Sequence, residues 1–426
     1  MVNNFRTLLS SLVSAQKKEV LINTSWRTVT VVFDKFVRLV LVLSVANILG
    51  PNIFGQYSYL LSLISIAFTF TGWGMGVLLV RDLKLSKNRS EVFSNALVVK
   101  VCIIFLSVVA AMVISFTRSY QFILPSLFIV GTLSSSHVRD IFIGVFLGLQ
   151  KIKYEFLVIL SEDFLLLSGF FFWFIKKPSF LNLVILYTFA MFFSLFIAFL
   201  LSKKLVKFNR FSINKFRVRS LLKDGFPLSL FGITSYLFFS TDQIVLHLFR
   251  GDYETGVYSF SARIILALAA VPSLVNTVLL PYLSRYKSNK MVIIRIIKYG
   301  LGLLCLLSIF LITLVYSIGP YFIRWFKPQY VTALPLLKLS SLTLLFTFTV
   351  SILDFVMLTY NYQKQDFLLT LKAGICNLVL LFILVPKYGV YGVIIASMIS
   401  QLLNLFLTGK YVLRILKKTD DTFLAT

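Results

Sequence analysis

The chain has 426 residues, of which 58% are hydrophobic and 44 are phenylalanine, against only 16 Asp and Glu. A soluble protein has roughly 45–50% apolar residues, and no soluble core of this size could bury the excess. The composition therefore excludes a soluble globular protein and predicts an integral membrane protein. The net charge of +26 does not indicate nucleic-acid binding, because the basic residues lie between apolar runs and no nucleic-acid motif is present.

Apolar runs of about 20 residues, the length that crosses the hydrocarbon core, recur along the whole chain. The first six predicted spans are 24–48, 57–80, 95–117, 121–148, 156–175 and 180–201. The second six are 225–249, 256–283, 293–318, 331–357, 366–385 and 389–414. We therefore expect an all-α integral membrane protein with twelve transmembrane helices.

The longest polar stretch, KKLVKFNRFSINKFRVRSLLKD, follows the sixth span. It predicts an amphipathic surface helix or linker on the cytoplasmic leaflet. We expect an N-terminal lobe over 1–202, a basic linker over 203–224 and a C-terminal lobe over 225–426. Six spans in each lobe give both lobes the same orientation, so the two lobes are predicted to be parallel repeats around a central cavity.

Lysine and arginine predict the orientation. With both termini in the cytoplasm, 27 of the 42 basic residues lie in cytoplasmic segments and seven lie in outer loops. Cytoplasmic loops of membrane proteins carry the excess of Lys and Arg, so this asymmetry predicts cytoplasmic termini.

The sequence offers no set of metal ligands. The three cysteines lie singly inside apolar runs, and two histidines cannot form a metal site by themselves. We therefore predict no metal and no cofactor.

A short motif occurs twice. GPNIFGQYS begins at Gly50 and GDYETGVYS begins at Gly251, and both read G-x-x-x-x-G-x-Y-S. The copies occupy equivalent places, after the first span and after the seventh. Glycine permits positive φ and a close approach of helices, and tyrosine suits the membrane interface, with an apolar ring and a wet hydroxyl. The motif is predicted to be architectural.

Four stretches carry a resemblance to a known family: LGPNIFGQYS, GVLLVRDL, GVFLGLQKIKY and FFSTDQIVLHLF. The chain resembles the Wzx-type polysaccharide flippases of the multidrug/oligosaccharidyl-lipid/polysaccharide exporter superfamily over nearly its whole length. The resemblance implies two six-helix lobes, alternating access and a lipid-linked oligosaccharide as cargo. It also implies a bacterial inner membrane, an undecaprenyl-pyrophosphate carrier and, as partners, a polymerase and a chain-length regulator.

Charged residues inside the spans are candidate site residues. Each costs about 2.5–3.5 kcal/mol at mid-bilayer, and such residues face a bundle interior or a water-filled cavity. The candidates for binding the cargo are Arg27, Arg38, Arg139, Arg263 and Asp242. An arginine fork suits a pyrophosphate because it can bind two oxygens at once. The alternative for Arg27 is that it reaches the lipid headgroups. The alternative for Arg139 is an interhelical ion pair, and that for Asp242 is structural pairing with the other lobe.

The candidates for coupling to H⁺ or Na⁺ are Asp34, Glu162, Asp163 and Asp354. Asp34 and Arg38 stand four residues apart and are predicted to pair on one helix face.

Three functions are compatible with the sequence and compete as interpretations. The first is a flippase for an O-antigen or capsule repeat unit. The second is a cation-coupled multidrug exporter of the same fold. The third is an O-antigen polymerase or ligase, which is disfavoured because no outer loop is long enough to hold a catalytic site. A lipid II flippase also resembles this fold but has two further spans.

Overall fold

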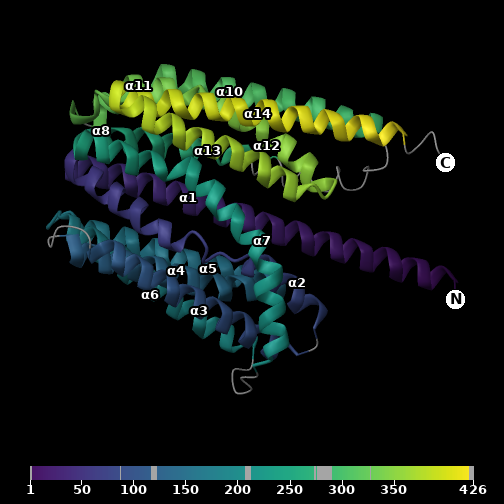
Figure 1. The fold of residues 1–426 in the computed structure, drawn as a ribbon. Coiled ribbons are helices and arrows are strands. Elements are labelled where there is room, and N and C mark those ends of the chain that lie inside the picture. The colour runs from purple at the N-terminus through teal and green to yellow at the C-terminus, as the bar shows by residue number, and fades with distance from the viewer. Residues whose placement is uncertain are drawn as a thin grey trace. The chain divides into compact units, whose positions relative to one another are not determined.

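The computed structural model describes residues 2–86, 88–116, 122–206, 213–272, 275, 290–326 and 328–421. Within these ranges the chain forms helices joined by short turns and no strand (Figure 1). The predicted all-α fold class is confirmed. The helices form because apolar runs in a membrane must satisfy every backbone N–H and C=O internally.

The helices pack into two compact units, each described here by itself. Unit 1 comprises Met1–Leu41 and Thr71–Ser229. It contains the first part of α1 (Val2–Phe68), α2 (Met75–Leu85), α3 (Arg89–Phe116), α4 (Ile123–Gly148), α5 (Ile152–Gly169), the π-helical turn η2 (Phe170–Phe174), α6 (Phe180–Lys203) and the first part of α7 (Lys215–Phe239). Its core includes the fully buried side chains of Phe93 and Phe146.

Unit 2 comprises Val42–Phe70 and Leu230–Thr426. It contains the ends of α1 and α7, then α8 (Thr241–Leu268), α10 (Lys290–Phe326), the 3₁₀ turn η3 (Pro328–Tyr330), α11 (Ala333–Ser341), α12 (Thr343–Thr359), α13 (Gln363–Tyr388) and α14 (Val390–Asp421). Leu344, Phe348 and Val356 on α12 are fully buried in its core.

Seven helical segments of the described residues are long and apolar enough to cross a membrane: Arg89–Phe116, Ile152–Phe174, Phe180–Lys203, Met291–Arg324, Ala333–Thr359, Gln363–Tyr388 and Val390–Leu416. They coincide with seven of the predicted spans. The other predicted spans lie on α1, α2, α4, α7 and α8, and the end of the eighth, 276–283, lies outside the described residues. Large apolar side chains such as Phe164 (70% exposed) and Phe172 (76% exposed) point outward, as a lipid-facing surface requires.

The repeated motif marks two helix kinks. Gly50 has φ 78° inside α1, and Gly251 has φ 77° inside α8. This is the left-handed region that glycine adopts without the steric cost of a Cβ. The predicted use of the first glycine of each copy for a positive φ is confirmed.

The second glycine of each copy permits a close helix crossing. A Cβ at Gly55 would overlap the carbonyl oxygen of Asp252, and a Cβ at Gly256 would overlap the carbonyl oxygen of Pro51. Each copy of the motif therefore packs on the backbone of the other copy. This reciprocal crossing is why residues 42–70 group with unit 2, whereas the sequence repeat places them in the lobe over 1–202.

The basic linker predicted over 203–224 is partly helical. Residues 207–212 lie outside the described residues, and from Lys215 the chain is already the first turn of α7. Arg217 lies 3.8 Å from a carboxylate oxygen of Asp82 and 3.8 Å from one of Glu91. Arg217 of this segment thus pairs with acidic residues on α2 and α3, and the segment continues directly into a predicted span.

Candidate functional site

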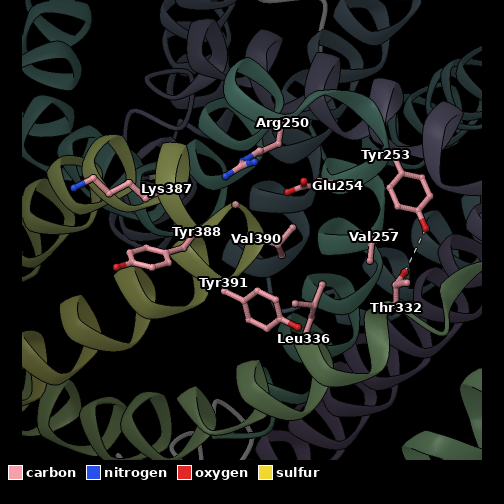
Figure 2. A pocket seen from close by; sticks show the side chains of 11 residues that line it. Arg250, Tyr253, Glu254, Val257, Thr332, Leu336, Lys387, Tyr388, Val390 and Tyr391 are labelled. Carbon is pink, nitrogen blue, oxygen red and sulfur yellow. Dashed lines mark hydrogen bonds between the residues drawn. The ribbon is translucent and has the colours of Figure 1, made fainter.

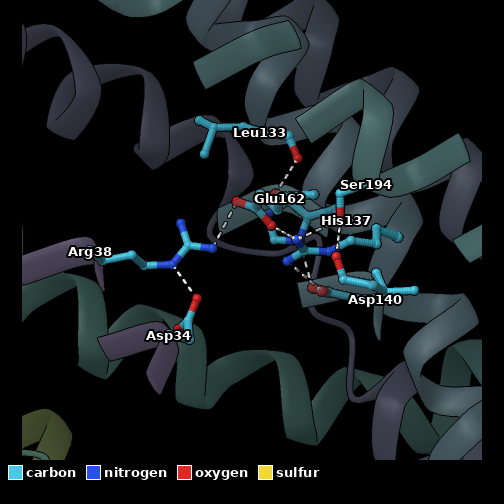
Figure 3. Close-up of polar contacts among 10 residues, drawn as sticks. Asp34, Arg38, Leu133, His137, Asp140, Glu162 and Ser194 are labelled. Carbon is cyan, nitrogen blue, oxygen red and sulfur yellow. Dashed lines mark hydrogen bonds and ion pairs between the residues drawn. The ribbon is translucent and has the colours of Figure 1, made fainter. Parts of the chain in front are cut away.

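Three helices of unit 1 bring four charged side chains together in an otherwise apolar setting. Asp34 and Arg38 come from α1, Arg139 from α4 and Glu162 from α5. The Glu162 side chain is only 1% exposed, and that of Arg139 is 11% exposed. We refer to Asp34, Arg38, Arg139 and Glu162 as the Glu162 cluster; Figure 3 shows it with its neighbours.

Glu162 bridges the two arginines. Arg38 donates from Nη2 to Glu162 Oε1 at 2.7 Å, and Arg139 donates from Nη1 to Glu162 Oε2. Arg38 also donates from Nε to Asp34 Oδ1 at 2.5 Å, which confirms the pair predicted from their spacing. Charge-assisted hydrogen bonds of this kind are among the strongest in proteins. The arrangement therefore ties α1, α4 and α5 together.

Other polar groups surround Arg139. Its Nη1 lies 3.4 Å from the Ser194 hydroxyl, which itself donates to the Val158 carbonyl at 3.2 Å. Its Nη2 lies 4.0 Å from Asp140, and His137 Nδ1 lies 3.9 Å from the same carboxylate. The contacts of Arg139 therefore match the alternative given for this residue, an interhelical ion pair.

Asp163 is buried next to Glu162 in the sequence. It is 0% exposed, and neither of its carboxylate oxygens accepts a hydrogen bond from the described residues. An unpaired ionised carboxylate is very costly in a low-dielectric interior. Such a group is stabilised either by a proton or by a bound cation, which is the chemistry expected of a coupling site.

The charges of the Glu162 cluster balance. Two arginines face two carboxylates, and Asp140 and Asp163 beside them add two more acidic groups. The arginines are therefore already neutralised in this structure. Arg38 keeps a side chain that is 30% exposed, so it is the member best placed to change partners.

Asp242 of α8 lies in unit 2 and is bound by three donors. Its carboxylate accepts from Tyr258 Oη at 2.6 Å, Asn377 Nδ2 at 3.2 Å and Ser397 Oγ at 3.4 Å. The side chain is 3% exposed and lines a small, mostly apolar cavity of about 80 Å³. The three donors lie in the same lobe as Asp242, so the alternative of structural pairing with the other lobe is wrong for these contacts.

The position of Tyr258 differs from what the sequence predicted for the tyrosines of the repeated motif. The repeat tyrosines were expected to expose a wet hydroxyl at the membrane interface, but Tyr57 is 9% and Tyr258 is 8% exposed. The expectation is wrong for Tyr258 because its hydroxyl is used to donate to the buried Asp242. The partners Tyr258, Asn377 and Ser397 were not singled out as site residues, although Asn377 is a visible polar interruption of an apolar run.

Asp354 of α12 lies near the carboxyl group of Asp366, at the start of α13, which was not among the predicted site residues. The Oδ1 atoms of both side chains are buried without a hydrogen-bond partner within the described residues. Asp354 also lines a cavity of about 200 Å³ with the polar side chains of Ser351, Thr370 and Gln401.

The remaining predicted site residues are not members of the Glu162 cluster. Arg27 is exposed on α1, with the buried Glu155 as an electrostatic partner. Arg263 is on α8 in unit 2, and its Nε is buried without a hydrogen-bond partner among the described residues. A charge not considered as a site residue, Lys100, is 3% exposed and donates from Nζ to the Thr71 carbonyl at 2.6 Å.

No group of three or more potential metal ligands occurs within the described residues. The polar groups that the helices do bring together are ion pairs and hydrogen-bonded carboxylates. Their arrangement within apolar helices is typical of membrane transporters, in which intramembrane charges mark cargo or ion pathways.

Solved structures share this fold. The lipid II flippase MurJ in an inward closed conformation matches with a TM-score of 0.73 and 16% identity, over 89% of this chain and 86% of that chain. An inward-facing multidrug resistance MATE family transporter of the MOP superfamily matches with a TM-score of 0.70 and 13% identity, over 91% of this chain and 96% of that chain. The fold is that of a membrane transporter.

Residues 20–287 match the family model described as polysaccharide biosynthesis protein, and the chain belongs to this family. It is 28% identical over 221 residues to an uncharacterized membrane protein of Methanocaldococcus jannaschii, which is 51% of this chain and 51% of the relative. It is 27% identical over 237 residues to the uncharacterized membrane protein EpsK of Bacillus subtilis, which is 54% of this chain and 47% of the relative. The chain thus spans about half the length of these curated relatives.

Proposed function

We propose that this chain is a flippase that moves an undecaprenyl-pyrophosphate-linked oligosaccharide, an O-antigen or capsule repeat unit, from the inner to the outer leaflet by alternating access. Membership of the polysaccharide biosynthesis family supports the class of cargo. The observation that carries the proposal is the Glu162 cluster, which places two arginines within apolar helices.

The proposed role of Arg38 is exchange of partners. Its side chain is the most exposed of the Glu162 cluster. Its planar fork can hold two phosphate oxygens as it now holds carboxylate oxygens of Asp34 and Glu162. An arriving pyrophosphate would replace these carboxylates, whereas Arg139 would stay bound to Glu162 and keep α4 and α5 together.

Coupling to H⁺ or Na⁺ would follow from the same exchange. When Arg38 moves to the cargo, Glu162 loses one of its two cationic partners and joins Asp163 as an undercompensated buried carboxylate. A proton or sodium ion taken up at this pair would restore the charge balance. Asp34 and the Asp354–Asp366 pair of unit 2 are further candidates for this role.

The protein would act in the bacterial inner membrane with both termini in the cytoplasm. A polymerase and a chain-length regulator would receive its product on the outer face. No cofactor other than the coupling ion is needed, because flipping breaks and forms no covalent bond. The contributions of Arg27, Arg263 and Asp242 to cargo binding are part of the same proposal.

A cation-coupled multidrug exporter is the second candidate. One observation favours it: four acidic groups, Asp34, Asp140, Glu162 and Asp163, surround only two arginines in unit 1. A net acidic site suits a cationic cargo better than a pyrophosphate. The two candidates therefore differ in the sign of the charge that the site must accept.

Complementation tests the proposal. The chain is expressed in flippase-deletion strains with known surface polymers, beside Arg38→Ala, Arg38→Lys and the control Arg81→Ala, whose side chain is half-exposed on α2. We expect the parent and Arg81→Ala to restore surface polymer, Arg38→Lys to restore part of it and Arg38→Ala to fail. Bare cells with well-expressed parent protein, together with resistance to cationic drugs, would support the exporter instead.

A further inference from the structure

A pocket of about 370 Å³ opens in unit 2, lined by none of the predicted site residues but including Tyr253, Glu254 and Val257 of the second copy of the repeated motif (Figure 2). It lies between the kink of α8, the start of α11 and the turn that joins α13 to α14. Its volume falls in the range of ligand pockets, roughly 300–1,000 Å³. In the predicted topology this turn and this kink face the outer side of the membrane.

Gly389 forms part of the pocket wall. It ends α13 with φ 56° and ψ −132°, and its N–H donates to the Val385 carbonyl at 2.8 Å. A Cβ at this position would come within 2.7 Å of Glu254 Oε2 and 3.3 Å of Arg250 Nε. The missing side chain therefore leaves both of these charged groups open to the pocket.

Arg250 is held by backbone groups. Its Nη2 donates to the Pro386 carbonyl at 2.9 Å, and its Nε lies 3.4 Å from the Val385 carbonyl. These carbonyls end α13, where a cation also complements the helix dipole. Neutral carbonyls fix the guanidinium in place but leave its charge available to a ligand.

Glu254 supplies a hydrogen-bond acceptor beside Arg250. It stands four residues further along α8, beyond the kink at Gly251, and Figure 2 shows both side chains directed into the same space. The Lys387 amine extends away from both of them in this view. The charges of Arg250 and Glu254 at the polar centre therefore cancel, and Lys387 belongs to the pocket lining with its amine directed away from them.

Three tyrosines surround this centre. Tyr253 is 45%, Tyr388 is 56% and Tyr391 is 46% exposed, and Figure 2 shows Tyr253 on the side opposite to Tyr388 and Tyr391. Tyr253 also pairs with Thr332, their hydroxyl oxygens 3.4 Å apart. Tyrosine offers a broad apolar face and a polar tip, so the pocket presents aromatic faces around a donor and an acceptor.

We propose that this pocket binds a neutral sugar ring. A pyranose has apolar C–H faces that pack on aromatic rings, and a rim of hydroxyls that both donate and accept, which matches Arg250, Glu254 and the tyrosines. A pyrophosphate is disfavoured because Glu254 would repel it, and a lipophilic ligand would leave the charged groups of Arg250 and Glu254 unsolvated. That the sugar belongs to the flipped cargo, received here on the outer side, rests on the proposed function.

Binding is measured without transport. The full-length protein in nanodiscs is examined by saturation-transfer difference NMR with methyl α-glucopyranoside, methyl N-acetylglucosaminide and methyl glucuronide as probes. We expect the neutral glycosides to give signals that fall about fivefold in Tyr388→Ala and disappear in Glu254→Gln/Tyr388→Ala. The control is Tyr321→Ala, which removes a tyrosine that is 76% exposed on α10, outside the pocket.

Three results would overturn the proposal: no signal from any glycoside, binding of the glucuronide alone, or equal signals in Tyr388→Ala and Tyr321→Ala. The substituted tyrosines are exposed, so the variants are expected to fold, and gel filtration verifies this. A protein that binds glycosides in this pocket but restores no surface polymer would refute the flippase while leaving the sugar site intact.

Discussion

Glu162 is the residue on which the charged site of unit 1 depends. Each of its two oxygens accepts from a different arginine, and its side chain is almost completely buried. Removing one partner of a buried ion pair is strongly destabilising, since the other charge stays buried without compensation. The carboxylate of Glu162 therefore matters more to the fold of unit 1 than any single arginine does.

We expect Glu162→Gln to lower the free energy of unfolding by about 3–5 kcal/mol. The amide keeps the size of the side chain but removes the negative charge that Arg38 and Arg139 share. The measurement is thermal unfolding of purified protein in detergent, followed by intrinsic fluorescence. Asp140→Asn serves as the control, because that carboxylate is 52% exposed. Equal melting temperatures for the two variants would show that the Glu162 carboxylate does not stabilise the folded protein.

At the scale of single residues, the sequence predicts local pairs and misses distant ones. Asp34 and Arg38 could be paired from their spacing, because residues four apart share a helix face. The contacts of Arg38 with Glu162 and of Asp242 with Asn377 join residues 124 and 135 positions apart. Spacing along one helix carries no information about such contacts, which depend on how the helices pack.

Among the elements, the two copies of G-x-x-x-x-G-x-Y-S have the most specific geometry. The first glycine of each copy takes a positive φ, and the second lies against a backbone carbonyl of the other copy. Small residues let helices in membranes approach closely enough for backbone contact. The sequence predicted both uses of glycine, but it could not show that the two copies are each other's partners.

Gly55→Ala and Gly256→Ala are each expected to disrupt this crossing. Overpacking costs about 1–3 kcal/mol where side chains can move, and here the obstacle is backbone, so the loss should reach or exceed the upper end. Gly302→Ala on α10 is the matched control, since a Cβ there meets no atom within 4 Å. The readouts are the yield of monodisperse protein and its melting temperature; a wild-type yield for Gly55→Ala would contradict the crossing.

The overall architecture of the molecule was easier to predict from the sequence than its single contacts. Composition alone indicated a membrane protein, and the twelve apolar runs indicated its helices, because the hydrocarbon core imposes a minimum length on each span. The non-helical backbone at Gly50 and at Gly251 interrupts the helix within α1 and within α8. The polar residues of the repeated motif indicated these interruptions, but hydropathy could not indicate the backbone geometry, since it measures composition and not backbone direction.

Orientation in the membrane is a prediction at this scale. We expect a cysteine at Lys177, between α5 and α6, to react with a membrane-impermeant maleimide added to intact cells, after the three native cysteines are replaced by serine or alanine. A cysteine at Lys364 should react only after the cells are opened, because the basic loops lie in the cytoplasm. The reverse pattern of labelling would invert the topology.

The reciprocal glycine crossing also constrains how this chain can evolve. Duplication ordinarily frees one copy of a motif to diverge while the other preserves the original role. Here each copy supplies the surface against which the other copy fits, so a bulkier residue in either one damages both. Natural selection therefore acts on the pair as one unit, and the resemblance between Gly50–Ser58 and Gly251–Ser259 should outlast the similarity of the sequences around them.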